Sequence, residues 1–149
     1  MIPIKAIRLT LGTLAAADTT YLAAAAAMKV ALVKASFVPT ELLILANLTL
    51  ATFTGSAAKA GVAGAQGTGV DPATGNQIIT VLPPATGWRW VCTAAPTPAE
   101  TIYGYVLTDN AGAVLLATGL LPTPITIANV SDQIDLGDLQ LTINVKPIS

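Results

Sequence analysis

Three aspartates near the end of the chain are the strongest candidates for chemistry in this sequence. Asp132, Asp135 and Asp138 recur every three residues within SDQIDLGDL at positions 131–139. Carboxylate oxygens are the ligands that hard cations such as Ca²⁺ prefer, so this group could gather such an ion. The spacing differs from that of a Ca²⁺-binding loop, in which acidic residues occupy alternate positions. The alternative that we favour is a polar loop before the last strand, with the aspartates capping turns.

Other catalytic arrangements lack their key residues. The chain has no histidine, which is the commonest general base and metal ligand. Arrangements of the Ser-His-Asp and Cys-His types are therefore impossible. Glycines at positions 61, 64, 67 and 69 resemble a phosphate-binding loop only superficially, because the GxxxxGK[ST] spacing and its lysine are missing. We therefore predict that the protein is not an enzyme and that it uses no cofactor.

Four aromatic residues lie in two β-like runs. Trp88 and Trp90 fall in GWRWVCT at 87–93, and Tyr103 and Tyr105 fall in TIYGYVL at 101–107. Residues two apart in a strand share a face, so each pair presents both rings on one side. Such rings can form a platform for a sugar, but they are more often anchors of a core or of a subunit interface. We expect a core or interface role.

Charge is sparse along the whole chain of 149 residues. Apolar residues make up 53% and charged residues 10%, whereas charged residues make up roughly 25% of ordinary soluble domains. A net charge of −1 gives little repulsion between copies. Either the surface is unusually rich in alanine and threonine, or much of it is buried against other copies. We favour burial in an assembly.

The composition also limits the partners. The seven Lys/Arg are scattered among eight Asp/Glu without a basic stripe, so we expect no nucleic-acid binding. The longest apolar run, 21–28, is much shorter than the about 20 residues that span a membrane, so we expect no membrane insertion. The start faintly resembles a signal peptide, but polar residues interrupt its apolar stretch and we expect no cleavage. The single Cys92 is expected to be a small buried apolar residue.

Short runs with strand-like patterns and frequent turn signals predict an all-β fold. We expect one domain over 1–149, folded as a β-sandwich or barrel, with a jelly-roll arrangement among the options. A hairpin is expected from 101–107 and 113–118, and Pro122 and Pro124 are expected to frame a break. The predicted strands are 2–11, 29–34, 48–54, 77–82, 87–93, 101–107, 113–118, 125–128 and 140–145.

Three further segments have distinct expectations. Asp18 offers a helix N-cap before an alanine run, which predicts at most one short helix near residues 18–28, with close-packed strand as the alternative. Residues 61–76, GVAGAQGTGVDPATGN, predict a flexible glycine-rich loop. Residues 1–11 predict an N-terminal arm or edge strand that can add to a neighbouring sheet, and 143–149 is a second candidate.

The order of segments carries a resemblance. Residues 37–59 read FVPTELLILANLTLATFTGSAAK, and residues 101–143 read TIYGYVLTDNAGAVLLATGLLPTPITIANVSDQIDLGDLQLTI. This order resembles a group of small bacteriophage virion proteins of the head decoration or capsid cement type. Those proteins have an L-T-x-A-T-F-x-G-Y-A segment, then a Trp, then I-Y-G-Y-x-V-T-D, a G-x-L/V-L return, a P-I turn and a final L-T-L strand. The chain departs from that pattern at Ser56 and Leu107, and the shared motifs carry over no catalytic residue.

The resemblance implies a decoration protein on the capsid surface of the virion, made in the host cytoplasm. Its partners would be the major capsid protein and other copies of itself, with a trimer as the expected oligomer. The alternative is a tail-fibre or receptor-binding module that contacts host glycans. A third reading, a cellular adhesin or pilin-like subunit, predicts a cleaved N-terminus. The expected interface residues are Ile2, Ile4, Ile7, Trp88, Trp90, Tyr103 and Tyr105.

Overall fold

The computed structural model describes residues 28–40, 42–70, 77–109, 111–112 and 114–145. Over these residues the chain forms nine strands and one turn of 3-10 helix. The six strand pairs of this part of the chain are all antiparallel. Strands with almost no helix confirm the all-β prediction. The elements are β1 (Lys29–Val33), η1 (Leu45–Asn47), β2 (Lys59–Ala60), β3 (Val62–Val70), β4 (Gln77–Leu82), β5 (Arg89–Val91), β6 (Glu100–Thr108), β7 (Leu115–Ile127), β8 (Gln133–Asp135) and β9 (Leu141–Val145).

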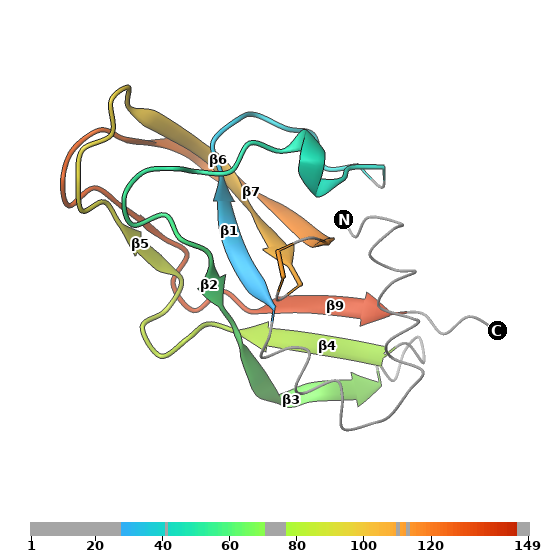
Figure 1. The fold of residues 1–149 in the computed structure, drawn as a ribbon. Coiled ribbons are helices and arrows are strands. Elements are labelled where there is room, and N and C mark those ends of the chain that lie inside the picture. The colour runs from blue at the N-terminus through green and yellow to red at the C-terminus, as the bar shows by residue number, and fades with distance from the viewer. Residues whose placement is uncertain (1–27, 41, 71–76, 110, 113, 146–149) are drawn as a thin grey trace.

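Three sheets build the fold. The main sheet has the strand order β2-β1-β6-β7, a second sheet has the order β3-β4-β9, and β5 pairs with β8 in a short ribbon (Figure 1). The predicted hairpin is β6–β7, closed by a turn in which the Gly112 N–H donates to the Asp109 carbonyl. The strand predicted at 29–34 is β1, and it lies between β2 and β6.

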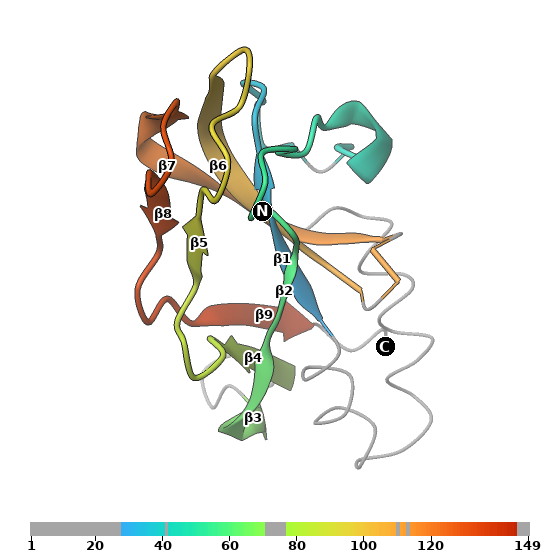
Figure 2. The same ribbon diagram turned by 60° about the vertical axis from the view of Figure 1, so that its left-hand side comes forward.

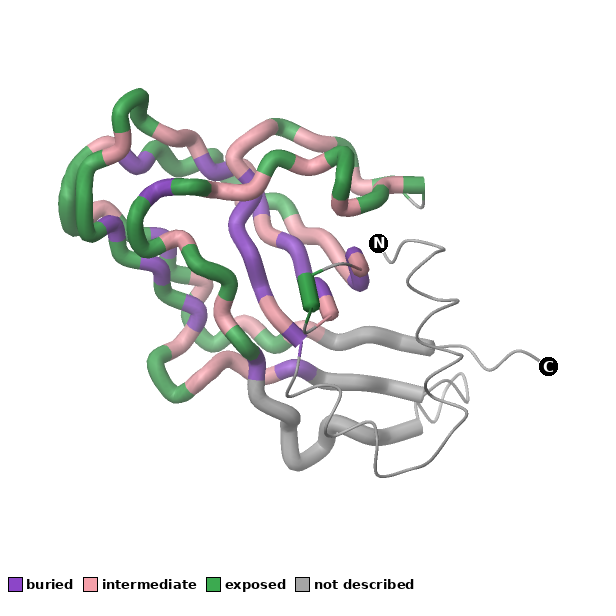
Figure 3. Tube along the Cα trace, in the orientation of Figure 1, coloured by how far each residue is buried: buried purple, intermediate pink, exposed green. Residues whose placement is uncertain are grey.

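The main sheet is buried on both faces at β1, because this strand is apolar on both. Val30 and Leu32 enter a large core that also contains residues of the other two sheets, such as Val81 and Ile134. Ala31 and Val33 face the opposite way and enter a second cluster. Figure 3 shows β1 as a largely buried strand between exposed peripheral loops. The main sheet therefore packs against the other sheets as one layer of a sandwich.

A long excursion between β1 and β2 covers the second face of the main sheet. We call its first part, residues 35–40 and 42–48, the lobe. Phe37, Leu43, Leu45 and Leu48 of the lobe, with Leu50 just after it, pack against the second cluster. Figure 2 shows the lobe standing beside β1, on the side away from the β5–β8 ribbon. The lobe thus takes the place of a further sheet.

The strand predicted at 48–54 is wrong. The segment is anchored to strand backbone through two isolated bridges, Val33 with Leu50 and Thr54 with Ala94. Between these bridges, the Glu100 side chain accepts hydrogen bonds from the N–H groups of Thr52 and Phe53. The Glu100 carboxylate therefore accepts the hydrogen bonds that a neighbouring strand would otherwise accept from Thr52 and Phe53.

The loop predicted at 61–76 is also largely wrong. Val62–Val70 forms β3, which pairs with β4 and has a register irregularity between Ala63 and Thr68. Glycine weakens an isolated strand, but a ladder with a β-branched neighbour can override that preference. Residues 71–76 lie outside the described residues.

The break predicted at Pro122 and Pro124 is not found, because β7 continues through both prolines. In the register with β6, Leu120 pairs with Gly104 and Ile125 pairs with Ile102, so residues 121–124 have no partner there. Proline cannot donate to a ladder, and a bulge is where a strand tolerates it. The β6–β7 ladder is therefore interrupted at residues 121–124, although the backbone of β7 stays extended through them.

Two sequence predictions lie outside the described residues. They are the N-terminal arm at 1–11, with Ile2, Ile4 and Ile7, and the short helix near 18–28. At the other end, the first residues of the second candidate arm, up to Val145, belong to β9 and pair with β4. That part of the arm is therefore already engaged in a sheet.

Candidate functional site

The two tryptophans form a stacked pair in the core. Trp88 and Trp90 are fully buried, with ring centroids 6.4 Å apart and planes at 11°. The Trp88 Nε1 donates to the Leu139 carbonyl at 2.8 Å, and the Trp90 Nε1 donates to the Ala57 carbonyl at 2.9 Å. The same-face prediction is confirmed. Of the two roles expected for these rings, the structure shows the core, and their assignment as interface residues is wrong because both are fully buried. Neither ring is exposed for contact with a sugar or a subunit.

The two tyrosines of β6 are partly buried. Tyr105 packs against the large core, and its ring lies over Gly119, where an added Cβ would come within 2.2 Å of the ring. Burial raises the pKa of Tyr105. Tyr103 lies opposite the unpaired stretch of β7 and keeps part of its surface exposed. Of the four aromatic candidates, Tyr103 is the one whose position best suits a contact with a partner.

Two of the three aspartates accept backbone N–H groups at turns, as expected. The prediction that the whole segment is a loop is wrong, because Gln133–Asp135 pairs with β5 as strand β8. Asp132 Oδ2 accepts two backbone N–H groups of the preceding turn, at 2.8 and 2.7 Å. These hydrogen bonds lower the pKa of Asp132. Asp135 accepts the Gly137 N–H at 2.8 Å and pairs with Arg89 at 2.8 Å. Within the part of the chain that the structure describes, no three His, Cys, Asp or Glu side chains are placed to hold a metal ion.

Cys92 has the position expected from its sequence context. It is buried just after β5, with its thiol donating to the Ala94 carbonyl at 3.2 Å. It contributes to the large core as a small apolar residue.

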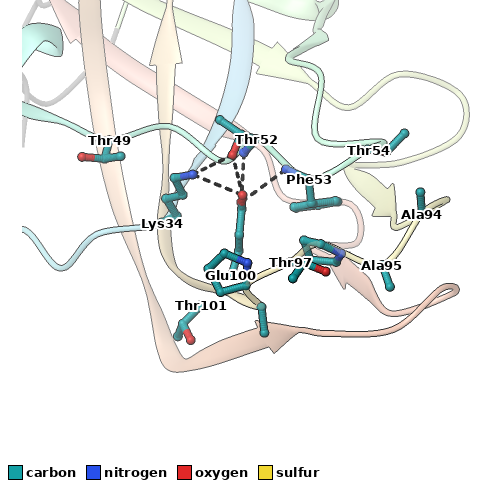
Figure 4. Close-up of a pocket in the computed structure, with 13 residues that line it drawn as sticks. Lys34, Thr49, Thr52, Phe53, Thr54, Ala94, Ala95, Thr97, Glu100 and Thr101 are labelled. Carbon is teal, nitrogen blue, oxygen red and sulfur yellow. Dashed lines mark hydrogen bonds and ion pairs between the residues drawn. The ribbon is translucent and has the colours of Figure 1, made fainter.

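A pocket of about 550 Å³ lies at the start of β6 (Figure 4). One wall comes from residues 49–54 and the other from residues 94–101. Threonine, alanine and proline side chains form most of the lining, and Lys34 and Glu100 supply its charges. Sequence reasoning did not select this site, because its two charged residues are 66 positions apart.

Glu100 is the centre of a hydrogen-bond network in this pocket. Its carboxylate accepts from the Thr52 N–H at 2.9 Å, the Phe53 N–H at 3.3 Å, the Thr52 hydroxyl and the Lys34 Nζ at 3.1 Å. Burial alone would raise the pKa of Glu100, but the hydrogen bonds from Thr52 and Lys34 outweigh it and lower the pKa. The carboxylate is thus held in its ionised form.

The network fits a structural fastening better than proton transfer. Both oxygens of Glu100 already accept from the protein, and the Lys34 ammonium donates to Glu100 and to the Thr52 hydroxyl. A general base needs a lone pair within reach of a substrate proton and a pKa near the working pH. The pKa of Glu100 is lowered, so this carboxylate is a poor proton acceptor near neutral pH. The network ties the 48–54 segment to β1 and β6.

Large aliphatic side chains are exposed on the lobe. Val38 is 73% exposed, Leu42 is 82% exposed and Ile44 is 41% exposed. Sequence reasoning missed these residues, although a signal was present. Between Lys34 and Lys59 the sequence contains one charged residue, Glu41, and the run Leu42–Ala46 is wholly apolar, which is unusual for a surface loop.

Comparisons with known proteins add no assignment. No family model, curated protein or solved structure matches the chain. Among the described residues, no helix has the length and apolar character that crossing a membrane requires.

Proposed function

We propose that this chain is a structural protein of a virus particle, a capsid decoration protein that stabilises the phage head. It would bind the major capsid protein on the outside of the shell and bridge neighbouring subunits, together with other copies of itself, as a trimer. It acts by adding binding free energy at the seams between subunits and performs no turnover. Its place is the capsid surface, after synthesis in the host cytoplasm.

The observation that carries the proposal is exposed aliphatic surface on a chain with few charges. Val38 and Leu42 expose 73% and 82% of their surfaces, although charged residues make up only 10% of the sequence. Large apolar side chains that are exposed together on one segment are typical of a surface that contacts other proteins. A subunit that is held in a lattice meets that condition.

The resemblance to head decoration proteins supports the same function. Its two segments, 37–59 and 101–143, contain the lobe and the β6–β7 hairpin, which lie against each other across the second cluster of the core. The second segment supplies the paired strands β6 to β8, and the first supplies the lobe that covers the main sheet.

The alternative of a glycan-binding tail-fibre or receptor-binding module has less support. Sugar platforms need exposed aromatic faces, whereas Trp88 and Trp90 are fully buried. Tyr103 alone of the four aromatic candidates remains well placed for such a contact. We therefore keep the decoration protein as the proposal.

Quantitative mass spectrometry of purified particles tests the proposal. The number of copies of this chain is measured relative to the major shell protein. A ratio near one, or a simple fraction of it, agrees with decoration across the whole lattice. A handful of copies per particle would favour the tail or receptor role, and absence from particles would refute a virion role altogether.

A truncation tests how the chain attaches. Removal of residues 1–11 should abolish binding to shells while the β core stays folded, because the arm is expected to supply an added strand. Circular dichroism confirms the fold, and co-sedimentation with undecorated shells measures binding. Undiminished binding by the truncated chain would contradict the role of the arm.

A further inference from the structure

The lobe makes no hydrogen bond to the rest of the chain among the residues that the structure describes. The N–H groups of Leu43, Asn47 and Leu48 donate to carbonyls within the lobe, at 3.2, 3.0 and 3.0 Å. The strands around it are instead held by ladders, such as the one between β6 and β7. Apolar contacts with the second cluster are therefore what seats the lobe on the main sheet.

The two ends of the lobe meet at a neck. The Lys34 N–H donates to the Thr49 carbonyl at 2.8 Å, so the chain leaves β1 and returns to nearly the same point. A surface segment whose ends lie together in this way is an Ω-loop, and such loops are frequently functional. We call the lobe together with its neck, residues 34–40 and 42–52, the flap.

The flap covers one face of the main sheet and is itself shallowly packed. None of its described residues is buried, whereas the flanking Val33 and Phe53 are. Beneath it lie the four buried residues of the second cluster, while the large core with both tryptophans lies on the opposite face. Of the flap, only the small Ala51 also packs against the large core. Opening of the flap would therefore uncover the second cluster and leave the large core packed.

Glu100 fastens both ends of the flap at once (Figure 4). Its Oε1 accepts from the Lys34 Nζ at 3.1 Å at one end, and its Oε2 accepts from the Thr52 N–H at 2.9 Å at the other. The Thr52 hydroxyl also donates to Oε1. Glu100 itself belongs to β6, and its side chain is only 11% exposed. One carboxylate on a strand therefore holds the two ends of the flap to each other and to the main sheet.

We infer that the flap is a lid that opens as one unit while the rest of the fold stays closed, and that Glu100 is the latch that holds it shut. Units that open below the free energy of global unfolding have few buried contacts and few protected hydrogen bonds to their surroundings. The flap meets both conditions. The chain thus has a closed form that hides the apolar second face of β1 and β6 and an open form that presents it. This inference concerns the isolated chain and does not depend on the proposed function.

Amide hydrogen exchange of the full chain, followed residue by residue by NMR, tests the lid. The N–H groups of Lys34 and Ala51 report on the flap, because both donate at its neck. The N–H groups of Cys92 and Leu136 report on the rest of the fold, because they donate between the β5 and β8 regions at 2.8 and 2.9 Å. In the natural chain we expect the flap reporters to exchange at least about tenfold faster than the other two.

Two variants separate opening of the flap from global unfolding. Glu100→Gln weakens the latch, and exchange at Ala51 should accelerate about five- to thirtyfold, which corresponds to about 1–2 kcal/mol. Trp90→Phe weakens the large core instead. Exchange at Cys92 and Leu136 should then accelerate, while Ala51 keeps its natural rate.

Asp135→Asn is the matched control for the loss of a carboxylate. Asp135 also accepts a backbone N–H and pairs with a cation, both at 2.8 Å, but it lies outside the flap. This variant should leave the exchange rate of Ala51 unchanged. If Glu100→Gln does not fold, Lys34→Met removes one donor of the latch and should still accelerate Ala51 about two- to fivefold.

Exchange of the flap and core reporters at one common rate in the natural chain would overturn the inference, because a single cooperative unit behaves in that way. Acceleration of Ala51 together with the core in Trp90→Phe would overturn it as well. An unchanged rate at Ala51 in Glu100→Gln, or an equal acceleration by Asp135→Asn, would overturn the role of Glu100 as the latch.

Discussion

Replacement of Glu100 by glutamine is the most direct test of the polar network in the pocket. Glu100→Gln keeps the shape of the side chain and removes its charge. The carboxylate now accepts from two backbone N–H groups, the Thr52 hydroxyl and the Lys34 ammonium. Glutamine keeps one acceptor oxygen and places an NH₂ group where the other was. Either the two backbone N–H groups, or the Thr52 hydroxyl and the Lys34 ammonium, are therefore left facing the glutamine NH₂ group in place of an acceptor.

The expected cost follows from these contacts. A hydrogen bond to a charged group contributes about 1.5–3 kcal/mol, and a buried donor without an acceptor costs about 1–3 kcal/mol. Because glutamine retains half of the acceptors, and because the exposed Thr52 can donate to water instead, we expect Glu100→Gln to lower the free energy of unfolding by about 1–2 kcal/mol. Removal of Lys34 should cost less, about 0.5–1 kcal/mol. Its side chain is 26% exposed, against 11% for Glu100, and Glu100 would keep its other donors.

Urea unfolding followed by tryptophan fluorescence measures both changes, because Trp88 and Trp90 are buried in the native state and exposed by unfolding. The comparison uses Glu100→Gln and Lys34→Met in the same background, with the double variant to obtain the coupling between them. A Glu100→Gln chain within about 0.5 kcal/mol of the natural protein would refute the assigned network. Equal costs for Lys34→Met and Glu100→Gln would refute the conclusion that the backbone donors dominate.

Three further predictions concern pH, the core and a turn. The folded-state pKa of Glu100 lies below its ordinary value of 4.5, so Glu100 is protonated more readily in the unfolded chain. Stability therefore falls as the pH drops through and below 4.5. Urea midpoints measured at successive pH values should fall less steeply for Glu100→Gln than for the natural chain. Trp90→Phe loses ring volume and an indole hydrogen bond, and calorimetry should show a loss of about 2–4 kcal/mol. Gly55 has φ of +110°, and an added Cβ would lie 2.1 Å from the Val91 carbonyl oxygen. Gly55→Ala should therefore cost more than about 2 kcal/mol in urea unfolding, against about 1 kcal/mol for Gly112→Ala, whose φ is +68° with open space around it.

The sequence predicts the strands that depend on local pattern. β1 and β4 are alternating or continuous β-branched runs bounded by turn signals, and both lie where expected. The Trp88–Trp90 pair follows from the period of a strand, and its burial follows from the size of the rings. Such features need no knowledge of the rest of the chain.

The features that sequence reasoning missed depend on partners that are distant in the chain. Glu100 belongs to a stretch that reads as a proline-containing loop, and only its contact with Thr52 and Phe53 gives it a role. β3 is a strand because β4 lies beside it, not because its glycines favour extension. Pro122 and Pro124 lie in a continuous strand because the register with β6 skips that stretch.

The pairing of β1 with β6 has a consequence for the time course of folding. Lys29 pairs with Thr108 and Val33 pairs with Gly104, so the central contact of the main sheet closes a loop of about half of the chain. Loop closure of this length is slow, whereas the β6–β7 hairpin can form from neighbouring residues. During synthesis, β1 leaves the ribosome long before its partner strand exists, with apolar side chains on both faces. In the newly made chain, Val30–Val33 is therefore exposed and unpaired for a time, and it can aggregate with other chains. The yield of native protein on refolding should fall steeply as the protein concentration rises.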